Sequence, residues 1–213
     1  MSYILIALVI TNVYKGFTVG FDQTLLYFGA PALCGLKAAS LVSIDDKLAA
    51  ASEKKLQTLN AELGKNGRGI INVKRCGSRT LFFLYDRKVL QLSLSGKKEL
   101  AYLAAKNYPV RKGFNAILSE LLKRLSFQES FPHEIGIFLG YPLEDVILFE
   151  KQKGEGCLYS GMWKVYGNVQ ESLGKMTLYR NCCMKCNRLF ERGMKLTEIS
   201  RDYNTIGELP ESV

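Results

Sequence analysis

The stretch IINVKRCGSRTLFFLYD, residues 70–86, decides the fold class. Its two runs, IINVKR and TLFFLYD, are rich in β-branched and aromatic residues, which are typical of strands. The segment CGS between them supplies a turn glycine, and Arg79 can begin the second run. Residues 70–86 are therefore predicted to form a β-hairpin.

Helical patterns precede this hairpin. Residues 22–28 are predicted to form a short helix that is broken at Gly29 and Pro31, because both residues disfavour a continuing helix. Residues 43–64 are predicted to form a second helix, with Ser43 as its N-cap. The hairpin is thus expected to pack against helices that come before it.

Further helices and strand candidates follow the hairpin. Apolar residues at helical spacing make residues 114–125 the clearest amphipathic helix of the chain. Two short helices in 87–110, a helix at 142–152 and a long helix at 168–193 are also predicted, with strands at 133–140 and 157–167. This order predicts a mixed α+β (α/β) domain with a small sheet and a β-hairpin flanked by several helices.

The composition fits one domain. The chain has 213 residues, of which 47% are hydrophobic and 23% are charged, and it shows no repeat or low-complexity linker. We expect a single globular domain at residues 21–205, an N-terminal extension at 1–20 and a C-terminal tail at 206–213. The apolar run within residues 1–20 is expected to be either a buried β-strand or an appended segment.

The N-terminal apolar run, residues 3–10, bears on the location of the protein. It lacks the basic start and small-residue cleavage pattern of a signal peptide, and it is too short to span a bilayer. A cytoplasmic protein without a membrane span is therefore expected. The six cysteines are then predicted to be reduced thiols.

The chain carries a formal net charge of +9. Its basic residues concentrate in residues 97–124 and 175–201, where they are interleaved with apolar residues at helical spacing. This pattern favours solvated helix faces over a nucleic-acid surface. Nucleic acid is thus the less favoured partner and a small-molecule ligand the more favoured one, while the oligomeric state cannot be read.

Motifs that would identify a cofactor are absent: the sequence has no phosphate-binding loop, dinucleotide fingerprint or zinc-protease motif. The segment CCMKC brings Cys182, Cys183 and Cys186 together with the spacing of half a metal or redox site. A structural zinc needs four ligands, and no second cysteine pair supplies the others. The sequence therefore predicts partly buried thiols and no stoichiometric zinc.

The segment PHEIGIFLGYPLEDV, residues 132–146, supplies a family resemblance. Together with GMWKVYG (161–167) and APALCGLKAASL (30–41), it resembles a bacterial family described as domain of unknown function 3793, which occurs mainly in Clostridia. The likeness runs from about residue 21 to residue 201. The family implies a place for the site but no reaction. Its gene neighbourhoods, beside flavodoxin and ferrous-iron transport genes, imply a link to iron or redox physiology.

The family pattern assigns candidate residues. His133, Glu134, Tyr141 and Glu144 match the signature, and Lys37 matches the lysine of the upstream block. Relatives often carry a cysteine at the position of Gly29, and the cysteines of CCMKC do not belong to the signature. The resemblance therefore does not imply an essential cysteine here.

These observations predict a pocket near the signature of a small-ligand or cofactor-binding protein; a binding protein and an enzyme both fit. The catalytic candidates are His133, Glu134 and Lys37, and the candidate ligand-binding residues are Tyr141, Glu144, Trp163 and Tyr166. In a strand His133 and Glu134 would face opposite ways, so a partner for His133 is expected from Glu144, Tyr141 or Lys37. The alternative is a non-catalytic interaction or nucleic-acid-binding protein that uses its basic helices.

Overall fold

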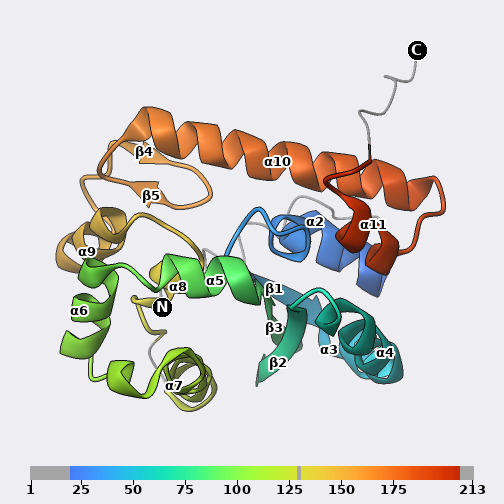
Figure 1. The fold of residues 1–213 in the computed structure, drawn as a ribbon, viewed down its shortest axis with the longest axis horizontal. Coiled ribbons are helices and arrows are strands. Elements are labelled where there is room, and N and C mark those ends of the chain that lie inside the picture. Colours follow the sequence, from blue (N-terminus) through green and yellow to red (C-terminus); the bar gives the residue numbers. More distant parts are fainter. Residues whose placement is uncertain (1–19, 129–130, 207–213) are drawn as a thin grey trace.

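The structure is a computed structural model that describes residues 20–128 and 131–206 (Figure 1). The expected extension at 1–20, apart from Gly20, and most of the expected tail at 206–213 lie outside the described residues. Within the described ranges, no helix has both the length and the apolar character that crossing a membrane requires.

A three-stranded antiparallel sheet forms the centre of the fold. Its strands are β1 (Ala39–Asp45), β2 (Arg68–Cys76) and β3 (Arg79–Asp86), in the order β1-β3-β2. β2 and β3 form the predicted hairpin, and Arg79 does begin the second strand. The predicted mixed α+β class with a small sheet is therefore confirmed.

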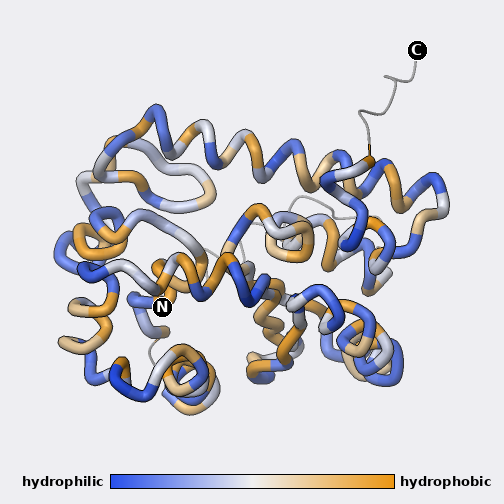
Figure 2. The backbone as a smooth tube through the Cα atoms, viewed as in Figure 1, coloured by the Kyte–Doolittle hydropathy of each residue, from blue (hydrophilic) through white to orange (hydrophobic). Residues whose placement is uncertain are grey.

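Helices cover both faces of the sheet, because successive residues of β3 point to opposite sides. Phe82 and Leu84 belong to one hydrophobic cluster and Phe83 to another, and the strands are largely hydrophobic in Figure 2. The first side holds α2 (Phe21–Leu33), α3 (Asp46–Ala51), α4 (Glu53–Gly64), α10 (Val169–Glu191) and α11 (Leu196–Asp202). The second side holds α5 (Arg87–Ser93), α6 (Lys97–Ala105), the 3-10 turn η1 (Val110–Lys112), α7 (Phe114–Phe127), α8 (Ile135–Phe138) and α9 (Leu143–Gln152).

The first helix corrects one prediction. α2 runs without a break through Gly29 and Pro31, where the sequence predicted an end. A Cβ on Gly29 would lie 2.2 Å from Leu84 Cδ2, so this glycine lets the helix approach the sheet closely. Pro31 lies in the last turn of α2, where it removes one helical N–H donor without ending the helix.

The predicted helix at residues 43–64 is wrong at its start and in its continuity. Ser43 lies in the unpredicted strand β1, where its Oγ accepts a hydrogen bond from Arg79 Nε at 2.8 Å. The N-cap is Asp45, whose carboxylate accepts from two backbone N–H groups of α3. Ser52 then separates α3 from α4.

The prediction of a strand at residues 133–140 is also wrong. This stretch forms the short helix α8, with helical turn bonds such as the one from Gly136 N to the His133 carbonyl. All residues of α8 are buried. The sequence pattern therefore could not show which side chains face the core and which face solvent. A Cβ on Gly136 would lie 2.7 Å from Val146 Cγ2, and the bare glycine therefore allows α8 to pack against α9.

Most other predicted elements are present. The helices in 87–110, 114–125, 142–152 and 168–193 correspond to α5, α6, α7, α9 and α10. The strand predicted at 157–167 is a small hairpin of β4 (Tyr159–Ser160) and β5 (Lys164–Val165). Helix α11, which packs beside α10 and α4 (Figure 1), was not predicted.

Candidate functional site

Glu134 and His133, the acidic and the basic residue at the start of the signature, have different neighbours. Glu134 is buried, and its Oε1 accepts hydrogen bonds from Arg124 Nη1 at 2.9 Å and Tyr108 Oη at 3.1 Å. Arg124 also donates to the backbone carbonyl of Lys106 at 2.8 Å. Glu134 thus ties α8 to α7 and to the segment between α6 and η1, because both ends of its ion pair are fixed by further hydrogen bonds.

His133 contacts α9. Its ring meets the Phe149 ring edge-on, with centroids 5.7 Å apart, and Glu150 of α9 lies within electrostatic range of it. Burial alone would raise the pKa of Glu150, but hydrogen bonds from Lys106 and Tyr102 lower it below its usual value. His133 therefore lies near the surface, where α8 and α9 meet.

Three of the expected site residues do come together. The rings of Tyr141 and Trp163 stack with centroids 4.8 Å apart and an interplanar angle of 20°. Lys37 Nζ lies 5.4 Å from the centroid of Tyr141 and 5.6 Å from that of Tyr179, on α10. We call Lys37, Tyr141, Trp163 and Tyr179 the aromatic–lysine cluster. It joins the α2–β1 loop, the α8–α9 turn, the β4–β5 hairpin and α10.

The amine of Lys37 is unusual in its surroundings. Its polar neighbour is Ser40 Oγ, at 3.5 Å, and no carboxylate within residues 20–128 and 131–206 forms an ion pair with it. Burial of the side chain lowers the pKa of Lys37 from 10.5 to about 8. The amine can therefore bind an anion, and it loses its proton more readily than an ordinary lysine.

Asp145 is a site residue that the sequence did not single out. It is 2% exposed and accepts hydrogen bonds from Trp163 Nε1 at 2.8 Å, Tyr166 N at 2.7 Å and Gly167 N at 3.0 Å. These bonds fix the indole ring against Tyr141. Its position one residue after the exposed Glu144 gave no signal for this role, since both acids suit the first turn of a helix.

The other two candidate ligand-binding residues differ from each other. Glu144 is exposed in the first turn of α9. Tyr166 is 8% exposed, and within the described part of the chain its buried hydroxyl has no hydrogen-bond partner. Neither residue belongs to the aromatic–lysine cluster, although the backbone of Tyr166 is held by Asp145.

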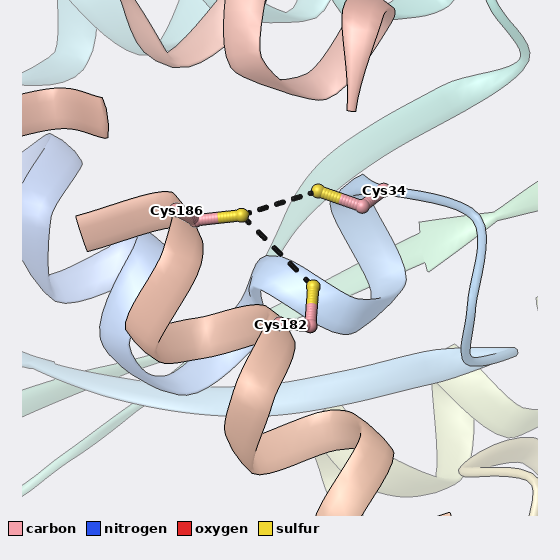
Figure 3. Close-up of side chains that lie close together, drawn as sticks. All are labelled: Cys34, Cys182 and Cys186. Carbon is pink, nitrogen blue, oxygen red and sulfur yellow. Dashed lines mark hydrogen bonds between the residues drawn. The ribbon is translucent and has the colours of Figure 1, made fainter. Parts of the chain in front are cut away.

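A second group of reactive side chains lies further along α10. Cys182 and Cys186 meet Cys34, at the end of α2, and all three are buried (Figure 3). Cys183 points elsewhere: it is half-buried, and its electrostatic neighbour is Lys37. The sequence grouped Cys183 with its neighbours because the spacing C-x-x-C resembles a metal or redox motif. It offered Cys34 only as one of several possible further ligands, beside Cys76, Cys157 and His133.

Comparison with known proteins identifies the family. A family model described as "Protein of unknown function (DUF3793)" matches residues 25–200, and the chain belongs to this family. No curated protein and no solved structure matches the chain. The matched range includes both the aromatic–lysine cluster and the three buried thiols.

Proposed function

We propose that this member of the family binds a small anionic ligand or cofactor through the aromatic–lysine cluster. The iron and redox setting implied by the family's gene neighbourhoods is the physiological context that we propose for this ligand. The observation that carries the proposal is Lys37, a desolvated amine that no carboxylate of the described residues neutralises. A buried charge without an acidic partner costs folding free energy, so its retention favours a role in binding.

The surroundings of Lys37 indicate what kind of ligand fits. Asp145, which accepts a hydrogen bond from the stacked Trp163 ring, has its oxygens engaged by Trp163, Tyr166 and Gly167, and does not pair with Lys37. An anion that contacts Lys37 gains a charge-assisted hydrogen bond in a poorly solvated setting. Tyr141 meets Trp163 and Lys37 and is only half-buried, so the exposed part of its ring can contact an apolar part of that ligand.

A matched pair of lysine variants tests the proposal. Protein purified without air is examined by native mass spectrometry and absorption for a retained ligand. Its melting temperature is then measured with inorganic phosphate, a dicarboxylate and an aromatic monophosphate. We expect Lys37→Gln to lose a stabilisation that the wild type shows, and the exposed control Lys47→Gln to keep it. Equal responses of both variants would remove Lys37 from the binding site.

The same geometry disfavours the nucleic-acid alternative. Base stacking requires accessible ring faces, whereas Trp163 and Tyr166 are 5% and 8% exposed. Both residues come from the segment GMWKVYG (161–167), where they flank the basic residue Lys164. A fluorescence titration with generic single-stranded DNA at low salt checks this point: tight binding that weakens steeply with added salt would restore the alternative.

A further inference from the structure

Three sulfur atoms converge from two helices that are far apart in the sequence. Cys34 is the C-cap of α2, while Cys182 and Cys186 lie one turn apart on α10. The Sγ atoms of Cys34 and Cys186 are 3.5 Å apart, and those of Cys182 and Cys186 are 3.9 Å apart. All three sulfurs lie within 4.8 Å of one another and point toward a common centre (Figure 3). We call them the thiol triad.

The size of the thiol triad fits one metal ion. Metal–thiolate bonds are about 2.3 Å long, so three sulfurs in a plane around one ion are roughly 4.0 Å apart. The sulfur distances of 3.5 and 3.9 Å, and the limit of 4.8 Å for the set, bracket this value. Small side-chain adjustments therefore suffice to place all three sulfurs at bonding distance from a shared ion.

The number of ligands selects the type of ion. The groups that could hold a metal within the described ranges contain only these three residues, and each of them is 0% exposed. Zinc prefers four ligands, and here neither a fourth side chain nor solvent is in position to supply one. Cuprous copper is a soft ion that is satisfied by three thiolates. We propose that Cys34, Cys182 and Cys186 bind one cuprous ion as a three-sulfur site.

Binding of the ion converts the thiols of the triad to thiolates. Each thiol releases its proton to solvent as its copper–sulfur bond forms, and the copper stays in the +1 state throughout. No oxidant or reductant is consumed.

Affinity measurements on reduced protein test the site. Protein kept anaerobically with a non-thiol reductant is titrated with cuprous ion against a coloured cuprous chelator. We expect one ion per chain, and a loss of affinity of at least about 100-fold in Cys34→Ser, Cys182→Ser and Cys186→Ser, since each removes a direct ligand. Cys183→Ser is the matched control on the same helix, and Cys76→Ser is an exposed one. Both controls are expected to bind as the wild type does.

A second measurement requires no variant and so does not depend on how the variants fold. X-ray absorption at the copper edge of the wild-type complex is expected to show three sulfur neighbours and no nitrogen or oxygen neighbour. The proposal is overturned by a wild type that fails to compete with the chelator, or by loss of binding in Cys183→Ser or Cys76→Ser. Tighter binding of zinc than of cuprous ion would overturn it as well, as would a Cys34–Cys186 disulfide in protein purified anaerobically. None of these outcomes bears on ligand binding at Lys37.

Discussion

Replacement of Lys37 by methionine is expected to change how the stability of the protein depends on pH. Burial lowers the pKa of Lys37 from 10.5 to about 8 in the folded state. Below pH 8 both the folded and the unfolded chain carry the proton, and the folded state bears the full cost of burying the charge. Between about 8 and 10.5 the unfolded state binds more protons, so this contribution to stability rises with pH.

The magnitude follows from the pKa difference. A shift of about 2.5 pH units corresponds to an upper limit of about 3 kcal/mol, at 1.36 kcal/mol per unit. Because the Lys37 side chain keeps some contact with solvent, we expect about half of that, or 1–2 kcal/mol. The free energy of unfolding of Lys37→Met minus that of the wild type should therefore fall by about 1–2 kcal/mol between pH 8 and pH 10.5.

Urea unfolding at a series of pH values measures this difference. Cysteines and tyrosines titrate in the same range, but they are present in both proteins and cancel in the comparison. Lys47→Met, at an exposed position, is the control and should run parallel to the wild type. A Lys37→Met curve that also runs parallel to the wild type would refute the claim that the Lys37 amine is desolvated in the folded state.

Three further expectations concern the scaffold. Gly136→Ala should lower the free energy of unfolding by about 1–3 kcal/mol in urea, because its Cβ would lie 2.7 Å from Val146 Cγ2. Asp145→Asn should cost about 2–3 kcal/mol by the same assay, since it weakens hydrogen bonds to a charged buried acceptor. It should also shift the emission of Trp163, the single tryptophan; an unchanged spectrum would contradict the contact. A chain lacking residues 1–20 should keep a cooperative melt, and aggregation of this truncation would assign the apolar run to the core.

The elements that could be predicted are those whose local pattern agrees with their tertiary setting. The hairpin of β2 and β3 combines β-formers with a turn glycine, and α7 buries one apolar face. β1 was missed because its last residue, Asp45, is also the N-cap of α3, so strand and cap signals overlap. The α8 turn was missed because all its side chains are buried, which removes the periodicity that distinguishes a strand from a helix.

The helix break predicted at Gly29 was wrong for a related reason. A glycine ends helices when the backbone needs a positive φ, but Gly29 has none and instead lies against Leu84. The sequence alone does not distinguish a glycine that ends a helix from one that allows close packing. Only the neighbouring strand shows which role Gly29 has. Close approach between α2 and the sheet is a tertiary requirement that no window around residue 29 encodes.

The sequence could identify single residues of the candidate site, but not which of them would come into contact. Tyr141 and Trp163 were each named from their own motifs, but the signature also contains Glu134, whose carboxylate is fully engaged by Arg124 and Tyr108. A residue that is already satisfied by remote partners has little capacity left for a ligand, however distinctive its motif. The region left for chemistry is the contact between the α2–β1 loop and α10. There Lys37 forms no ion pair with a carboxylate of the described residues, and three thiols converge. At that contact, residues 34–37 meet residues 179–186, which lie more than half of the chain away, and only the packing of α10 along α2 brings the two groups together.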